Sequence, residues 1–314
     1  MNRKPLLLLT ILLVLAGVST AHAQCTMKNK AFNSGEHLSY ELYFNWRFIW
    51  TKAGTASLWT DSINYNGAPA YKVQMISKSG SGADVFFKMR DTLTSVISKD
   101  MLPLYFRKGA EEGKRYSIDK ATYFYDSDSV RIKLERRFPR KNDYFCDTVA
   151  VTGCVQDMLS ILMRYRSYTP DKFKMGEPYH FDLADGRHVK QQTLIFRGYR
   201  LFEDENDIAY RCLVFSFIEY KKGKEREVIT FYITDDDNHL PVRLDMFLNF
   251  GSAKAFLKMY QGNRHPMTSV VKDKKAERKR LKALNLKLED EARAVAAEKA
   301  LLKAQKDSIA KLND

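Results

Sequence analysis

Between Glu36 and Gln261 apolar and polar residues alternate in one segment after another, and a two-residue period is the pattern of a half-buried β-strand. In the first segment Tyr43 is the apolar exception on an otherwise polar face. Asn66 and Gly67, a pair that favours tight hairpin turns, separate the second and third segments. These segments predict the opening of a β-meander. The apolar face of the first segment carries Leu38, Tyr40, Leu42, Phe44, Trp46 and Phe48.

Further strand-like segments follow at short intervals, with turns at residues 185–186, 222–223 and 235–238. Short strands joined by tight turns favour an antiparallel sheet that curls or closes on itself. The sequence therefore predicts a mostly β fold, a curved antiparallel sheet or open β-barrel. The predicted strands after the first cover residues 52–63, 70–77, 92–98, 104–108, 114–125, 130–136, 179–183, 189–196, 210–220, 227–234, 241–250 and 252–260.

One helix interrupts this pattern. Val155, Met158, Leu159, Leu162 and Tyr165 recur at steps of three and four residues, which gives an apolar stripe along a helix. An aspartate at position 157 lies where a carboxylate complements the helix dipole, and arginines at 164 and 166 lie towards the other end. We expect this helix to pack against one face or the mouth of the sheet. A shorter helical turn is expected over residues 83–89.

The first residues have the order of a secretory signal. Arg3 and Lys4 precede an apolar run from Leu6 to Val18, and the small-x-small pattern of Ala21 and Ala23 follows. The run is too short to span a bilayer as a helix. We expect residues 1–23 to be a cleaved signal peptide and the mature protein to be periplasmic. Lipid anchoring at the cysteine in position 25 is less favoured, because Gln24 and His22 do not fit a lipobox.

The chain changes character after residue 265. It becomes rich in Lys, Glu, Ala and Leu, and one seam of heptad positions is apolar while its companion seam is apolar only at the ends. We expect residues 24–265 to form the β-rich domain and residues 266–314 a charged helical tail, solitary or weakly self-associating. The apolar seam is Leu281, Leu288, Val295, Leu302 and Ile309.

The charge and the cysteine content of the chain limit the classes of function that it can have. The formal net charge is +14, but basic residues are interleaved with acidic ones, which gives no nucleic-acid footprint. Peripheral contact with anionic lipid head groups stays open. Four cysteines in an exported chain permit disulfides, and Cys146 and Cys154 are close enough in sequence to pair. The alternative is that some cysteines are buried free thiols.

No catalytic motif is present in the sequence. His180 and His188, with Asp182 or Asp185, could form a metal site across a hairpin, but cross-strand histidines in a structural role are commoner. The acidic run at 235–238 lacks the alternating ligands, glycine and distal glutamate of a calcium loop. We therefore predict no catalytic residues, no metal and no cofactor.

The remaining candidate is the apolar face of the sheet. A closed or half-closed sheet can hold a hydrophobic ligand, as the mouths of β-barrels do. The alternative is that the same side chains fill a packed core. The predicted ligand-binding residues are Tyr40, Phe44, Trp46, Tyr71, Met75, Phe231, Leu244 and Met246.

The order of several short motifs resembles a bacterial family of exported envelope proteins, the domain-of-unknown-function family numbered 3108. These motifs are residues 35–40, 52–56 and 156–160, together with Asp91, Pro103 and Pro241, within residues 32–262. The resemblance implies a periplasmic β-rich domain and supplies no catalytic residues. The prediction is a non-enzymatic envelope protein that binds a lipid or another apolar ligand, or docks to an envelope protein. The alternative is a structural scaffold that assembles through its helical tail.

Overall fold

The computed structural model describes residues 25–46, 49–84, 88–126, 129–170, 173–221, 223–248 and 251–312. The predicted signal peptide and Phe48 lie outside these residues, as does the side chain of Trp46. The strands are β1 (Glu36–Trp46), β2 (Ile49–Tyr65), β3 (Ala68–Ser79), β4 (Met89–Ser98), β5 (Pro103–Glu112), β6 (Arg115–Tyr125), β7 (Val130–Phe138), β8 (Asp143–Val151), β9 (Val155–Gln156), β10 (Pro178–Ala184), β11 (Val189–Glu203), β12 (Ala209–Lys221), β13 (Lys224–Thr234), β14 (Pro241–Leu248), β15 (Gly251–Gln261) and β16 (Val270–Val271). The helices are α2 (Ser81–Asp84), the 3-10 turn η2 (Pro139–Lys141), α3 (Met158–Arg166) and α4 (Lys274–Leu312).

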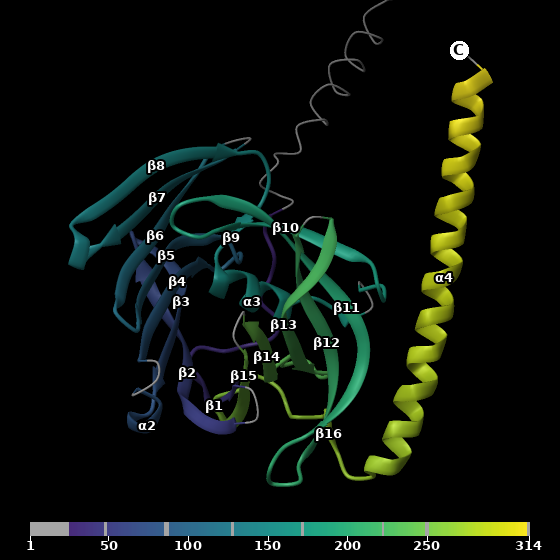
Figure 1. Cartoon of the computed structure of the whole chain (residues 1–314), viewed down its shortest axis with the longest axis horizontal. Helices are drawn as coiled ribbons and strands as arrows, with labels where there is room; N and C mark the ends of the chain where they lie inside the picture. Colours follow the sequence, from purple (N-terminus) through teal and green to yellow (C-terminus); the bar gives the residue numbers. More distant parts are fainter. Residues whose placement is uncertain are drawn as a thin grey trace, which may run out of the picture.

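The described strands form one sheet, in which two meanders meet where β1 pairs with β15. The path runs β8-β7-β6-β5-β4-β3-β2-β1-β15-β14-β13-β12-β11-β10-β9, and β16 adds to β12. All the pairings are antiparallel except that between β9 and β10. The two meanders curve towards each other on either side of α3 (Figure 1). The prediction of a mostly β, curved antiparallel sheet is therefore confirmed.

The turn between β10 and β11 brings the far end of the sheet against β6 and β7. Arg136 of β7 donates to Asp119 of β6 and also to the backbone carbonyl of Asp185 in that turn. Gly186 has a φ of +84°, and a Cβ there would lie 2.5 Å from the Cβ of Asp119. Glycine is therefore required for this close approach. The contact makes the sheet nearly closed.

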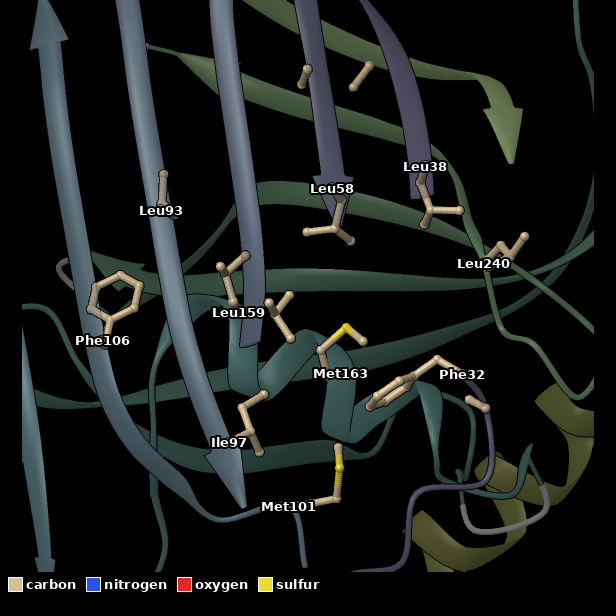
Figure 2. Close-up of a cluster of buried hydrophobic side chains, with 14 of the residues drawn as sticks. Phe32, Leu38, Leu58, Leu93, Ile97, Met101, Phe106, Leu159, Met163 and Leu240 are labelled. Carbon is tan, nitrogen blue, oxygen red and sulfur yellow. The ribbon is translucent and has the colours of Figure 1, made fainter. Parts of the chain in front are cut away.

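Helix α3 lies inside the curve and carries much of the core. Leu159 and Met163 are almost fully buried, and Figure 2 shows them among side chains that come from several strands of the first meander. The predicted helix exists, but it begins at Met158, after the short strand β9. Asp157 is its N-cap: the carboxylate accepts from the backbone N–H groups of Leu159 and Ser160. A capping box of this kind explains why the helix begins there.

Strand β8 is absent from the sequence-based prediction. It lies at one end of the strand path and pairs only with β7. One of its faces is exposed, and the other is only partly buried, through Phe145, Val149 and Val151, which pack against the main core cluster. Aspartates at 143 and 147 interrupt the apolar residues of that face, so the alternation is weak. Strand β11 is also longer than predicted, because it continues past a β-bulge at Arg197 and Gly198.

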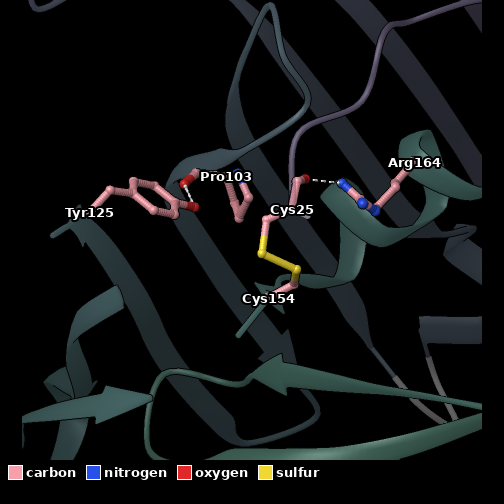
Figure 3. The surroundings of a disulfide bond; sticks show 5 residues. All are labelled: Cys25, Pro103, Tyr125, Cys154 and Arg164. Atoms are coloured by element: carbon pink, nitrogen blue, oxygen red, sulfur yellow. Dashed lines mark hydrogen bonds between the residues drawn. A yellow bond between two sulfur atoms is a disulfide. The ribbon is translucent and has the colours of Figure 1, made fainter. Parts of the chain in front are cut away.

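The disulfide joins Cys25 to Cys154, so the predicted pairing of Cys146 with Cys154 is wrong. Cys146 lies within the extended strand β8. Cys154 follows the end of that strand and lies beside the start of the described chain (Figure 3). Arg164 of α3 donates to the carbonyl of Cys25, 2.6 Å away. Cys146 is an exposed free thiol and Cys212 a buried one.

The C-terminal helix is present as predicted, but it begins at Lys274 and not at residue 266. The residues before it run along the sheet, where Val270 and Val271 form β16 beside β12. Among the described helices, none combines the length and apolar character that a membrane-spanning helix needs.

Candidate functional site

Most of the predicted ligand-binding residues pack into the core. The side chains of Tyr40, Tyr71, Met75 and Leu244 contact the main buried cluster, which also contains Leu159 and Met163 of α3. Phe231 packs against a second cluster built around Phe173, Phe196 and Phe215. Helix α3 thus fills much of the space that the prediction gave to a ligand. That these residues bind an apolar molecule stays a prediction.

Two further predicted residues are neighbours in the sheet. Phe44 of β1 and Met246 of β14 both pair with Ala253 of β15, so the register brings them into one cross-strand row. Both side chains are half-buried. The register thus places these two residues on one face of the sheet, although they lie on strands that are far apart in the chain.

A buried ion pair fixes α3 to the sheet. Arg166 donates to both carboxylate oxygens of Glu36, at 2.6 and 2.8 Å, and to the carbonyl of Asn238 between β13 and β14. The side chains of Glu36 and Arg166 are each 1% exposed. Such a pair is costly to bury and strongly destabilising to break on one side. Glu36, at the start of β1, therefore lies in the core.

Two hydroxyl groups beside this pair have no hydrogen-bond partner among the described residues. They belong to Tyr40 and to Thr60, which lies directly across from Glu36 in the β1–β2 ladder. Burial raises the pKa of the Tyr40 hydroxyl far above its usual range, partly opposed by the charge of Arg166. The Tyr40 hydroxyl therefore stays protonated at physiological pH.

Two buried carboxyl groups lie near the same helix. Burial raises the pKa of Asp157 to about 6, partly opposed by its hydrogen bonds from Ser160, Ser95 and Leu159. Burial likewise raises the pKa of Asp91 to about 6, and its Oδ1 has no partner among the described residues. Asp91 lies four residues before Ser95 on β4, which is roughly 13 Å along a strand. That spacing is too long for a catalytic carboxylate pair.

The candidate metal ligands are engaged in local hydrogen bonds. His180 bonds the hydroxyl of Thr193, and His188 lies 3.8 Å from Asp185 of its own turn. In the acidic run, Asp235 pairs with Arg211, and Asp236 accepts from Thr234, Asn238 and Ser269. No group of three metal-ligating side chains occurs among the residues that the structure describes.

A polar hollow of about 320 Å³ lies on the surface of β4, β5 and β6. Arg90 is paired with Asp84, and Arg140 with Glu111. Arg107 has no carboxylate partner within the described ranges. Charged and hydroxyl groups dominate the lining, so the hollow suits a small polar or anionic group and not an acyl chain. Its lining residues are Arg90, Thr92, Arg107, Gly109, Glu111, Tyr116 and Arg140.

Helix α4 docks on a free backbone edge of β11. The amide of Asn285 accepts from the backbone N–H of Tyr199 and donates to its carbonyl, both at 2.8 Å, as a neighbouring strand would. Leu281 is buried and Leu288 packs on the second cluster. Gly198 has a φ of +90°, and a Cβ there would lie 2.5 Å from Asn285 Oδ1. Glycine at this bulge is therefore needed for the helix to approach.

The last turns of α4 have few contacts with the sheet. Lys299 forms an ion pair with Glu177, and beyond it Leu301 and Leu302 are 61% and 50% exposed. In Figure 1 this end of the helix rises clear of the strands. The apolar heptad seam therefore has two environments: Leu281 and Leu288 pack within the molecule, and Leu302 faces solvent.

The comparisons with known proteins identify a family and give no activity. None of the curated proteins matches the chain. A solved structure, the crystal structure of a β-barrel-like protein of the domain of unknown function DUF1849 from Brucella abortus, is similar with a TM-score of 0.48 and 10% identity, over 77% of this chain and 100% of that chain. The family described as protein of unknown function (DUF3108) matches residues 39–258, most of the β-rich region. The chain therefore belongs to the DUF3108 family of proteins of unknown function.

Proposed function

We propose that this chain is a non-enzymatic protein of the bacterial periplasm, in which the nearly closed sheet is a packed scaffold and α4 is the element that makes contact with another molecule. The observation that carries the proposal is α4 itself. Its first half is tied to β11 through Asn285, and its end presents two exposed leucines, Leu301 and Leu302, on the same rigid helix.

Export is supported by two independent features. The first residues have the pattern of a cleaved secretory signal. The disulfide between Cys25 and Cys154 is of a kind that persists in oxidising compartments and is rare in the cytosol. A cysteine that is bonded to another cysteine cannot carry a thioether-linked lipid, so the disulfide also favours cleavage after Ala23 over lipoprotein anchoring.

The partner that we propose for the end of α4 is the same helix of a second copy. Beyond the docked part of the helix, Val295, Leu302 and Ile309 follow one another at seven-residue intervals, which is the spacing of a coiled-coil seam. The part of α4 that extends beyond the sheet is short. Because stable coiled coils need several heptads, the association should be weak.

Light scattering after size-exclusion chromatography tests this proposal on the mature chain, residues 24–314, over a range of protein concentrations. We expect the full chain to dimerise at high concentration and a chain that ends at Ala300 to stay monomeric. Leu301→Ser/Leu302→Ser should have the effect of the truncation, whereas Ala297→Ser/Ala300→Ser, also at exposed positions, should not. A full chain that stays monomeric throughout contradicts assembly through α4.

The competing function is that of a carrier for a lipid or another apolar molecule. Native mass spectrometry of the protein purified gently from its own envelope, followed by denaturing extraction, separates the two. A stoichiometric apolar adduct would require the core around Tyr40 and Leu244 to open for a ligand and would favour the carrier. A mass equal to that of the protein without an adduct favours the function as a scaffold.

A further inference from the structure

Two large exposed aromatic side chains lie in one cross-strand row at the ends of four neighbouring strands. Trp50 of β2 pairs with Asn45 of β1, Asn45 with Ser252 of β15, and Ser252 with Phe247 of β14. Directly opposed residues point to the same face of a sheet. Trp50 is 46% exposed and Phe247 41% exposed. The row therefore presents an indole and a phenyl ring to solvent from two adjacent hairpins.

A basic row lies behind the aromatic one on the same face. Lys52, Tyr43 and Lys254 are successive partners on β2, β1 and β15, and the row ends on β14 at the buried Asp245, whose carboxylate is paired with Arg243. The Tyr43 ring stacks on Trp50 at 5.5 Å, and the Lys254 ammonium lies 5.3 Å from the centre of the Trp50 ring. Lys52 pairs with Glu41, whereas Lys254 has no carboxylate partner in the described part of the chain. We call Tyr43, Trp50, Lys52, Phe247 and Lys254 the aromatic edge.

The size and chemistry of the aromatic edge suit a bilayer surface better than a protein. The exposed parts of Trp50 and Phe247 amount to roughly 200 Å², far below the ~800 Å² per partner of a stable protein interface. Rings of this kind are enriched where hydrocarbon meets water, because one side is apolar and the other polar. Lysines beside them complement anionic lipid head groups.

We propose that the aromatic edge binds the surface of a bilayer that contains anionic lipids. Trp50 and Phe247 enter the interface between head groups and acyl chains, and Lys52 and Lys254 lie at the level of the lipid phosphates. This contact is separate from self-association through α4, and it anchors the protein peripherally without a spanning segment.

Flotation of the full mature chain with vesicles tests the proposal. The probes are vesicles of phosphatidylcholine alone and vesicles in which one quarter of the lipid is phosphatidylglycerol. We expect binding to the anionic vesicles that weakens as salt rises, because head-group attraction is screened. Trp50→Ser/Phe247→Ser should lower this binding about tenfold or more, since apolar insertion is lost. Lys52→Gln/Lys254→Gln should remove the preference for phosphatidylglycerol.

The matched control is Phe124→Ser/Tyr144→Ser, which removes two aromatic side chains of similar exposure on β6 and β8. It should bind as the unchanged chain does. The chain that ends at Ala300 should also bind unchanged, which distinguishes this contact from the function proposed for α4. No binding by the full chain, or equal binding by Trp50→Ser/Phe247→Ser, overturns the proposal.

A measurement on the unchanged chain covers the case in which a variant does not fold. Its tryptophan emission should shift to shorter wavelength with anionic vesicles and be quenched by lipids brominated on the acyl chain. Trp59 is stacked on His37 within the β1–β2 ladder, so quenching reports mainly on the tryptophans near the aromatic edge. Emission that neither shifts nor is quenched contradicts insertion.

Discussion

Asp91 is a largely buried carboxyl group on β4, 8% exposed. Burial raises its pKa from 3.8 to about 6, and one of its oxygens has no hydrogen-bond partner among the described residues. Because its pKa is higher in the folded than in the unfolded chain, protonation favours the folded state. This stabilisation is complete at pH values below the pKa of the unfolded chain, 3.8, and is lost as pH rises through the pKa of the folded chain, about 6.

We therefore expect Asp91→Asn to stabilise the protein near neutral pH, by on the order of 1–2 kcal/mol, because it removes a buried charge. The gain should shrink as pH falls from about 7 to about 4, where the native carboxyl group is itself protonated. Urea unfolding at a series of pH values measures this difference. Asp61→Asn, at an exposed position, is the control. A difference that does not vary with pH would contradict the raised pKa.

The buried pair of Glu36 and Arg166 leads to a second prediction. Arg166→Met leaves an unpaired buried carboxylate and should lower the free energy of unfolding by about 3–5 kcal/mol. Glu36→Gln should be similarly costly, since it leaves the guanidinium without its counter-charge. The double variant should lose clearly less than the sum of the two, because neither charge is then stranded. Additive losses in denaturant unfolding would mean that the two side chains are not coupled.

At the scale of elements, alternation identified most of the long strands, and the helix stripe located α3. It did not identify β8, because aspartates interrupt the apolar residues of the one face of that edge strand that is partly buried. Alternation also could not distinguish a face that binds a ligand from a face that packs into a core. The side chains that fill this core come from α3, which lies in a distant part of the chain. The heptad seam of the tail was equally ambiguous: Leu281 and Leu288 recur for packing on this molecule's own sheet.

The prediction at the scale of elements concerns Asn285, which docks α4 on β11. Its amide accepts from the backbone N–H of Tyr199 and donates to the Tyr199 carbonyl at the β11 edge, and Asn285→Ala removes both of these bonds. We expect a loss of about 1–3 kcal/mol in the docking of α4. Hydrogen exchange should show faster exchange in the first half of α4 and at Tyr199. Leu286→Ala, one position along and half exposed, should leave both unchanged. Unaltered exchange in Asn285→Ala would show that the amide bonds do not hold the helix.

For the whole molecule, the disulfide pairing was beyond the reach of sequence spacing. Cys25 and Cys154 are 129 residues apart, and only the fold brings the start of the described chain beside the loop that leads into α3. Closeness in sequence favoured Cys146, but β8 is extended and carries that residue away from Cys154. Long-range contacts of this kind depend on how a curved sheet closes, which local patterns do not encode.

Thiol labelling tests this connectivity directly. In the native protein we expect only the exposed Cys146 to react with a maleimide; denaturation without reductant should add Cys212, and reduction should add the remaining two. Closing so long a loop restricts the unfolded chain, so Cys25→Ala/Cys154→Ala should cost roughly 3–5 kcal/mol of stability. Cys146→Ser should cost little. Native labelling at Cys25 or Cys154 would contradict the bond.

The same bond constrains how the protein matures. In an exported chain that emerges from its N-terminus, Cys146 reaches the oxidising side before Cys154 does. An oxidant that joins cysteines in order of appearance would link Cys25 to Cys146 first, and the native partner would arrive only afterwards. Reaching the native state from there requires attack by a thiolate on the misplaced bond. The protein is thus expected to depend on thiol–disulfide exchange for its maturation, and a Cys146→Ser chain should mature without that dependence.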